Sequence, residues 1–230
     1  MKLKRYGSDL LDFIYPPLCL ACEQRLYFPE EDLCFACLHD LPRTDFERYI
    51  ENPVFQIFKG RFPLQHAAAW LHFEKGGMAQ VLMHQFKYKD QPQLAFLLGK
   101  TLGEEWREAP ICREADIIIP VPLHPRKRRK RAYNQAEKIA EGLAKAIDKP
   151  VMADQLIRQV YKSSQTKAHR FNRWQQVKSV FSLKHGDALH GKHILLVDDV
   201  VTTGATLEAC LSAMKDIPGA RFSVITLAYA

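Results

Sequence analysis

The chain has 230 residues, of which 47% are hydrophobic and 26% charged, so it can build one sizeable core with a small appendage. It contains no apolar run of about 18 residues, which excludes a membrane-spanning helix. The basic N-terminal residues precede only a weakly apolar stretch, interrupted by Asp9 and Asp12. Because that pattern makes a poor secretory signal, we expect mature sequence and a cytoplasmic location.

The net charge of +7 is concentrated in the middle of the chain. Residues 120–186 contain 16 Lys and Arg against 4 Asp and Glu, whereas the rest of the chain is net acidic. Such a block suits a polyphosphate ligand or a nucleic-acid backbone. A solvated basic face without a partner is the alternative.

Four of the six cysteines form a Cys-x2-Cys-x11-Cys-x2-Cys pattern: Cys19, Cys22, Cys34 and Cys37. Each pair directs two thiolates at one point, so the two pairs predict a tetrahedral Zn²⁺ site. Since thiolates fill all four positions, the zinc is expected to be structural. An iron–sulfur cluster or disulfides, which need an oxidising compartment, are the alternatives. We expect a zinc module with its connector over residues 1–63 and a second domain over residues 64–230.

After residue 64, strand-like and helix-like patterns alternate. Strands are expected at residues 66–73, 116–121, 156–160, 180–183, 194–197 and 221–229. Helices are expected at residues 78–86, from Pro92 onward, at 134–147 and after residue 206. This alternation predicts an α/β fold with a mostly parallel sheet flanked by helices. Cys112 and Cys210 are interpreted as small buried hydrophobes.

The strand at residues 116–121 opens into a proline-braced loop that contains Val121, Pro122 and Leu123, followed by six cations from Arg126 to Arg131. Ligands of doubly wound sheets bind beyond the carboxyl ends of the strands. Arginines there suit a pyrophosphate, which they bind bidentately. Because six charges exceed what one pyrophosphate needs, part of the run is expected to bind nucleic acid or to be solvated. Asn134, just before the next helix, is interpreted as its N-cap.

Residues 161–173 are polar and basic, and no acid occurs between Gln155 and Gly186. One interpretation is a lid that closes over a ligand, with Lys167, Arg170 and Arg173 contacting phosphate groups. A basic loop without a role is the other.

The most informative stretch, residues 194–206, reads Ile-Leu-Leu-Val-Asp-Asp-Val-Val-Thr-Thr-Gly-Ala-Thr. Its apolar start predicts a buried parallel strand that ends at Asp198 and Asp199. A small, hydroxyl-rich turn then leads into a helix: Thr202, Thr203, Gly204, Ala205 and Thr206. The amides and dipole of a helix N-terminus favour a phosphate, whereas the carboxylates suit hydroxyls or a cation, so a ribose 5-phosphate fits. An ordinary strand-to-helix connection, capped by Thr203, is the alternative.

This string resembles the 5-phosphoribosyl 1-pyrophosphate (PRPP) motif of type I phosphoribosyltransferases. The resemblance implies that fold, with Asp198 and Asp199 as the catalytic acids that hold the ribose hydroxyls. It implies a 5-phosphate site at residues 202–206 and PRPP bound together with Mg²⁺. The pyrophosphate side is expected to comprise Val121, Pro122, Leu123, Arg126, Arg131, Lys167, Arg170 and Arg173.

The cysteine pattern and the segments at residues 86–90, 120–123, 131–135 and 165–173 are similar to those of the ComF family. ComF proteins are zinc-knuckle, phosphoribosyltransferase-like proteins linked to competence and DNA uptake in bacteria. The resemblance implies a nucleotide-metabolism type of reaction, in which phosphoribosyl is transferred to an unknown nitrogen acceptor and pyrophosphate is released. Some purine-salvage transferases carry an acidic base at the position of Thr202, and this chain does not.

Two other functions remain open from the sequence. One is a non-catalytic DNA-binding protein of competence, with single-stranded DNA and DNA-processing proteins as partners. Its basic run would bind the DNA backbone. The other is a PRPP-responsive regulator that binds the ligand without turnover.

Overall fold

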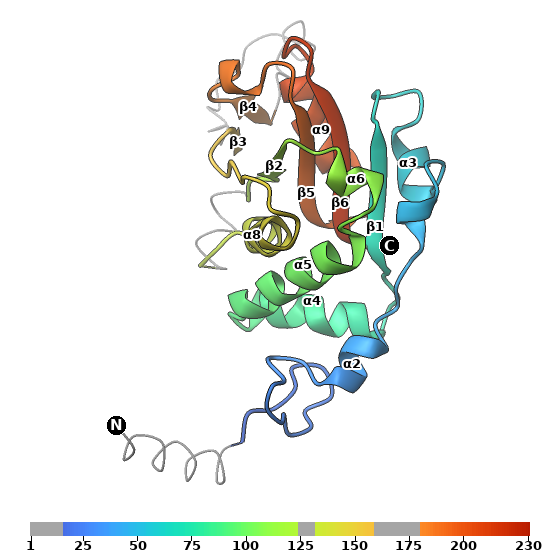
Figure 1. The fold of residues 1–230 in the computed structure, drawn as a ribbon, viewed down its shortest axis with the longest axis vertical. Helices are drawn as coiled ribbons and strands as arrows, with labels where there is room; N and C mark the ends of the chain where they lie inside the picture. Colours follow the sequence, from blue (N-terminus) through green and yellow to red (C-terminus); the bar gives the residue numbers. More distant parts are fainter. Residues whose placement is uncertain (1–15, 124–131, 159–179) are drawn as a thin grey trace, which may run out of the picture.

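The computed structural model describes residues 16–123, 132–158 and 180–230 (Figure 1). Its centre is a parallel sheet of four strands in the order β1-β6-β5-β2. These strands are β1 (His66–His72), β2 (Ile117–Pro120), β5 (His193–Val201) and β6 (Arg221–Tyr229). Two short strands, β3 (Leu156–Arg158) and β4 (Phe181–Leu183), form a separate antiparallel pair. The predicted α/β fold with a mostly parallel sheet is therefore confirmed.

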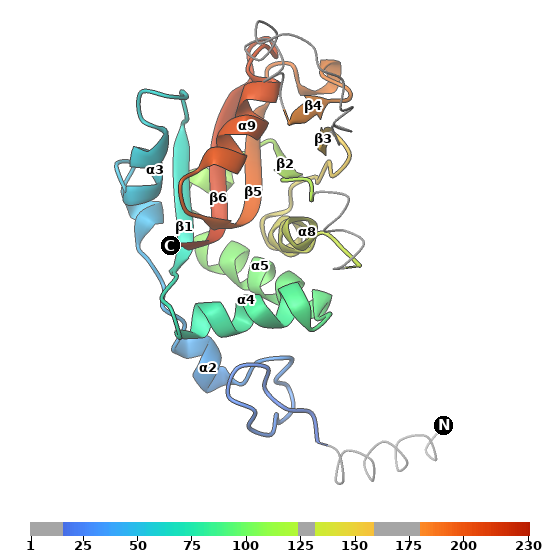
Figure 2. The same cartoon turned by 180° about the vertical axis from the view of Figure 1, so that it is seen from behind.

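Helices cover both faces of this sheet, and α9 lies on the opposite face from α5 (Figures 1 and 2). The apolar stripes predicted at helical spacing correspond to α4, α5 and α8, and the helix expected after the hydroxyl-rich turn is α9. The helices are α2 (Phe35–His39), α3 (Pro53–Phe58), α4 (Met78–Tyr88), α5 (Pro92–Trp106), α6 (Pro110–Arg113), α8 (Gln135–Ile147) and α9 (Ala205–Met214), with short 3₁₀ turns η1 (Phe46–Arg48) and η3 (Asp187–Leu189).

Helices α5 and α8 cross in direct backbone contact. A Cβ atom added at Gly99 of α5 would lie 2.2 Å from the Ile139 carbonyl oxygen, and one at Gly142 of α8 would lie 2.0 Å from that of Phe96. No side chain fits at such distances, so the two glycines set how closely the helices cross. This crossing holds α8 against β2 and β5, with its N-terminus at the carboxyl edge of the sheet.

The four-cysteine module, residues 16–41, is joined to the sheet domain through Arg43. The Arg43 guanidinium binds the Glu105 carboxylate of α5 at 2.7 and 2.9 Å, and donates to the carbonyls of Leu38 and His39 at 2.9 Å. The Trp70 indole of β1 donates to the same carboxylate at 2.7 Å. Because module and sheet converge on one carboxylate, the module is docked onto the larger domain. The boundary after residue 63 stays a prediction.

Across the residues that the structure describes, no helix combines the length and the apolar character needed to cross a membrane.

Candidate functional site

Asp198 and Asp199 lie within strand β5, which continues beyond them to Val201. The prediction that the strand ends at these two acids was therefore wrong. The strand runs on to Val201 because β6 keeps pairing with it, Asp198 lying opposite Thr226 and Val201 opposite Tyr229. On the other side β2 ends with Pro120 opposite Val197. Asp198 and Asp199 therefore lie in the part of β5 that extends beyond the end of β2. This is the carboxyl edge of the sheet, where ligands of such sheets bind.

A cavity of about 280 Å³ lies at this edge. It brings together Asp198, Asp199, Thr202 and Thr206 from the string and Val121, Pro122 and Leu123 from the proline-braced loop. The two segments face one crevice, as the sequence predicted. Side chains from three further elements complete the lining: Lys87 of α4, Asn134 to Ala136 at the start of α8, and Arg158 of β3.

Asp199 forms a largely buried ion pair with Lys87. The Lys87 Nζ lies 2.8 Å from the Asp199 Oδ2, and each side chain is only 15% exposed. The Asp199 amide donates to the Asp198 Oδ1 at 2.9 Å. Burial, together with the neighbouring Asp199 charge, raises the pKa of the Asp198 carboxyl to about 8. A carboxyl that keeps its proton at neutral pH can both donate to and accept from a hydroxyl group.

The turn after β5 has two kinds of residue. Thr202 and Thr206 are exposed and line the cavity, whereas Gly204 is buried against α3. Gly204 is the N-cap of α9 with a φ of +73°, and a Cβ there would lie 2.6 Å from Ile57 Cγ2 of α3. Only glycine meets both demands. The alternative with Thr203 as the N-cap was wrong, because that position belongs to Gly204 and the Thr203 Oγ1 is 3.5 Å from the Ala205 amide.

Asn134 occupies the N-cap position of α8, but in the described chain its side chain makes no capping bond. Its Nδ2 instead donates to the Val121 carbonyl at 3.0 Å. The prediction of a plain helix cap was therefore wrong in its chemistry. Asn134 fastens the proline-braced loop to α8 and so fixes one wall of the cavity.

Sequence reasoning missed the roles of Lys87 and Arg158. The Arg158 guanidinium stacks on the Phe181 ring at 5.2 Å, and its buried Nε has no hydrogen-bond partner among the described residues. An unpaired buried N–H beside a cavity is costly unless a ligand satisfies it. Lys87 lies in one of the segments on which the ComF resemblance rests, but nothing local in the sequence shows that it reaches Asp199.

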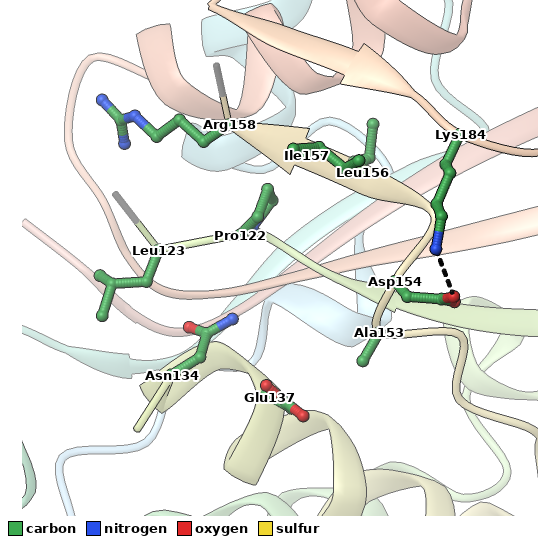
Figure 3. Close-up of a pocket in the computed structure, with 10 residues that line it drawn as sticks. All are labelled: Pro122, Leu123, Asn134, Glu137, Ala153, Asp154, Leu156, Ile157, Arg158 and Lys184. Atoms are coloured by element: carbon green, nitrogen blue, oxygen red, sulfur yellow. Dashed lines mark hydrogen bonds and ion pairs between the residues drawn. The ribbon is translucent and has the colours of Figure 1, made fainter. Parts of the chain in front are cut away.

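A second cavity of about 600 Å³ adjoins the first and shares Pro122, Leu123, Asn134 and Arg158 with it. In Figure 3, Asn134 and Glu137 enter from α8, and Leu156 to Arg158 enter from β3. Lys184 and Asp154 form an ion pair at 3.5 Å along one side (Figure 3). The five cations predicted on the pyrophosphate side lie outside the described residues: Arg126, Arg131, Lys167, Arg170 and Arg173.

The four cysteines of the N-terminal pattern converge at one point. The Sγ atoms of Cys19, Cys22, Cys34 and Cys37 lie within 4.8 Å of one another, and those of Cys22 and Cys34 are 3.7 Å apart. Sulfurs bound tetrahedrally at about 2.3 Å from one Zn²⁺ lie about 3.8 Å apart, so the cluster fits such an ion. Burial raises the pKa of the Cys37 thiol, whereas amide donors at Cys22, Cys34 and Ala21 outweigh burial and lower that of Cys19 to about 7. Because the four sulfurs lie so close together, the cluster can hold a metal ion such as zinc.

Comparison with known proteins gives consistent matches. The phosphoribosyl transferase domain family matches residues 133–230. Competence protein F of Haemophilus influenzae is 24% identical over 86% of this chain and 91% of its own length. DNA utilization protein YhgH of Escherichia coli O157:H7 is 28% identical over 55% of this chain and 56% of its own length. Competence protein ComFC of Bacillus subtilis is 31% identical over 40% of this chain and 35% of its own length. The chain thus spans about half or less of the last two relatives.

Proposed function

This chain is a ComF-family protein with a type I phosphoribosyltransferase fold, and we propose that its carboxyl-edge cavity binds PRPP and transfers the phosphoribosyl group to a nitrogen acceptor. One observation carries this proposal. The acids Asp198 and Asp199, the hydroxyls of Thr202 and Thr206, and the proline-braced loop line a single cavity with two cations. That combination matches a ligand with a diol between two phosphate-bearing ends.

The proposed pose follows from the charge of each wall. The 5-phosphate takes the turn at residues 202–206, since the first amides of a helix such as α9 have no partners within the helix and favour an anion. The ribose hydroxyls take Asp198 and Asp199. The pyrophosphate takes Val121, Pro122 and Leu123 with the Arg158 Nε–H, which has no hydrogen-bond partner among the described residues. The sequence-predicted cations complete this side: Arg126, Arg131, Lys167, Arg170 and Arg173.

Mg²⁺ fits this pose because it prefers oxygen ligands. The pyrophosphate and ribose hydroxyls would hold it beside the two carboxyl groups, where it offsets the charge of the leaving group. In the free protein Asp199 is paired with Lys87, and the raised pKa of Asp198 keeps that carboxyl protonated at neutral pH. The two acids therefore present little uncompensated negative charge to a cation. We therefore propose that Mg²⁺ enters together with PRPP.

In the proposed reaction the bond between C1 of the ribose and the pyrophosphate oxygen breaks, and both of its electrons leave with the pyrophosphate. Arg158 and the basic side chains offset the charge that develops on the leaving group. The acceptor nitrogen then forms the new bond to C1. Because Thr202 stands where some relatives have an acidic base, this chain suits an acceptor that attacks without prior deprotonation.

We place the acceptor in the second cavity, which shares four residues with the first. Leu123, Leu156 and Ile157 offer apolar surface, whereas Asn134 and Glu137 offer polar groups. This combination suits a planar nitrogen base.

Calorimetry with PRPP and Mg²⁺ tests the binding step. We expect heat of binding with the wild-type protein and a loss of at least about 100-fold in affinity after Asp198→Asn with Asp199→Asn. Asp216→Asn, an exposed acid outside the cavity, is the matched control and should bind like the wild type. An absence of heat with the wild type, or unchanged affinity in the double variant, would contradict the proposal. Pyrophosphate release measured over a panel of nitrogen bases then separates an enzyme from a PRPP-binding regulator.

A second candidate function is the handling of DNA, which the names of the relatives favour. The positive charge of residues 120–186 supports it, since backbone contacts dominate nucleic-acid affinity. Binding of single-stranded DNA should weaken as salt rises and weaken further when Arg126 to Arg131 are neutralised. If those substitutions leave the affinity unchanged, the basic run is not the DNA site.

A further inference from the structure

Three consecutive residues at the end of α4 contact three separate parts of the molecule. The Gln85 Nε2 donates to the Leu20 carbonyl of the four-cysteine module at 3.1 Å. The Phe86 carbonyl accepts a hydrogen bond from the Tyr133 hydroxyl, just before α8. The Lys87 Nζ lies 2.8 Å from the Asp199 carboxylate. One helical turn therefore connects the module, the start of α8 and the cavity.

The contact of Lys87 with Asp199 depends on where that turn sits. Both side chains are largely hidden from solvent, so salt and water screen the pair weakly and a misplaced amine leaves a poorly compensated charge. Asp199 also adjoins Asp198, and its amide donates to the Asp198 Oδ1 at 2.9 Å. Among the described residues Lys87 is the cation that pairs with Asp199, so its position determines how that carboxylate is held beside Asp198.

The contact of Gln85 depends on the shape of the first cysteine knuckle. Leu20 lies between Cys19 and Cys22, and its amide donates to the Asp32 carbonyl at 2.8 Å. The direction of the Leu20 carbonyl is therefore tied to the closed loop around the four sulfurs. Metal binding to such a cluster is coupled to local folding, so loss of the ion would release this carbonyl.

The module has a second attachment that is independent of Gln85. Arg43 holds it to Glu105 of α5 through paired contacts at 2.7 to 2.9 Å. Removal of the Gln85 side-chain amide would therefore leave the module docked while removing its hydrogen bond to the end of α4. This separation makes the Gln85 contact testable by itself.

We propose that Gln85 is a positioning residue through which the metal-loaded four-cysteine module fixes the last turn of α4 and, with it, Lys87 against Asp199. The proposal rests on the proposed function, because it makes PRPP affinity at that site responsive to metal occupancy of the module. Linkage then requires the reverse effect, so bound PRPP tightens the hold of the module on its metal.

The first experiment measures PRPP affinity and metal release in the zinc-loaded protein. Gln85→Ala should weaken PRPP binding about threefold to tenfold, the range expected for one neutral hydrogen bond, and Lys87→Ala should weaken it further. PRPP should slow zinc transfer to a chelator in the wild type but not in Gln85→Ala. Gln80→Ala, on the same helix but in its first turn, is the matched control and should behave like the wild type. Equal slowing by PRPP in Gln85→Ala and wild type would overturn the proposal, since a merely structural glutamine would give that result.

The second experiment needs no PRPP, and so distinguishes failure of this coupling from failure of the proposed function. The Lys89 amide donates to the Gln85 carbonyl at 2.8 Å and reports on the end of α4. Its hydrogen exchange should accelerate when zinc is chelated from the wild type, and also in zinc-loaded Gln85→Ala, but not in zinc-loaded Gln80→Ala. Unchanged exchange at residues 85–89 after chelation, or an equal acceleration over the whole chain, would overturn the coupling. A wild-type protein that binds no PRPP but shows the local acceleration would instead refute only the proposed function.

Discussion

The two ends of strand β5 both carry buried polar groups, but they use them differently. At the start of the strand, the His193 Nε2 lies 2.8 Å from the Ser223 Oγ, and the His193 amide donates to Asp116 at 2.8 Å. At the other end, Asp198 and Asp199 face a cavity and share it with an arginine whose Nε is unpaired among the described residues. The first end packs into the core, although the buried His193 Nδ1 has no hydrogen-bond partner among the described residues. The second end opens onto a cavity, and that opening, rather than the pairing of each polar atom, distinguishes the candidate site from the structural end of the strand.

The largest expected effect is on stability at the structural end. His193→Ala removes a fully buried ring that stacks on His66. It also removes one hydrogen bond of the Ser223 Oγ, which still accepts from the His66 amide at 3.1 Å. We expect a loss of about 2–4 kcal/mol in the free energy of unfolding, from the cavity and the lost hydrogen bond. Urea unfolding measures it, with the exposed His185→Ala as the control. PRPP affinity should stay unchanged, and a marked fall in affinity would break the contrast between the two ends.

A smaller effect of the opposite kind is expected at the open end. Arg158→Leu removes the guanidinium, whose Nε has no hydrogen-bond partner among the described residues, while keeping an apolar side chain against Phe181. PRPP affinity should fall about tenfold, the size of one lost charge-assisted hydrogen bond, with little change in stability. Calorimetry and urea unfolding of the same sample measure both, and Arg107→Leu at an exposed position is the control. A large loss of stability without a loss of PRPP affinity would show that Arg158 stabilises the fold and does not bind the ligand.

A third difference between the two ends is in their pH dependence. Burial lowers the pKa of His193, so the unfolded chain binds more protons and this end loses stability as pH falls below about 6.5. Burial and Asp199 raise the pKa of Asp198 to about 8. The folded chain then binds more protons, and stability is lost as pH rises from about 4 through 8.

Two variants isolate these slopes. Asp198→Asn should reduce the loss of stability on the alkaline side, and His193→Gln should reduce it on the acid side. Thermal unfolding from pH 5 to pH 8.5 measures both. If both variants change stability on the same side of the pH profile, acid or alkaline, the two ends of β5 do not titrate independently.

The sequence predicted the site better where its residues are neighbours in the chain. The string at residues 194–206 identified the acids and the turn because strand, carboxylates and helix start follow one another directly. It predicted the end of β5 wrongly because pairing with β6, a later strand, decides how far β5 continues. Lys87 and Arg158 could not be found in this way, since their contacts join distant segments and leave no local pattern.

The fold shows the same division. The final strand was predicted with the bounds that β6 has, because it is rich in β-branched and aromatic residues, with only Ser223 and Thr226 as polar residues inside it. Asn134 was placed correctly at a helix start, but its bond to Val121 depends on a loop that lies before it in the chain. Local propensity thus predicts elements, and long-range packing decides what their side chains do.

The contact between the backbones of α5 and α8 has a consequence for how the cavity can adapt to its ligands. Gly99 and Gly142 leave no space between the two helices, so α8 cannot move toward α5. Asn134 transmits that immobility to the proline-braced loop. This wall of the cavity is therefore prevented from moving toward α5, whereas the wall that carries Arg158 belongs to the separate two-stranded pair of β3 and β4. We expect adjustment to ligands of different size on that second side. Selection for a new substrate would accordingly act first on β3 and its neighbours, and last on α8.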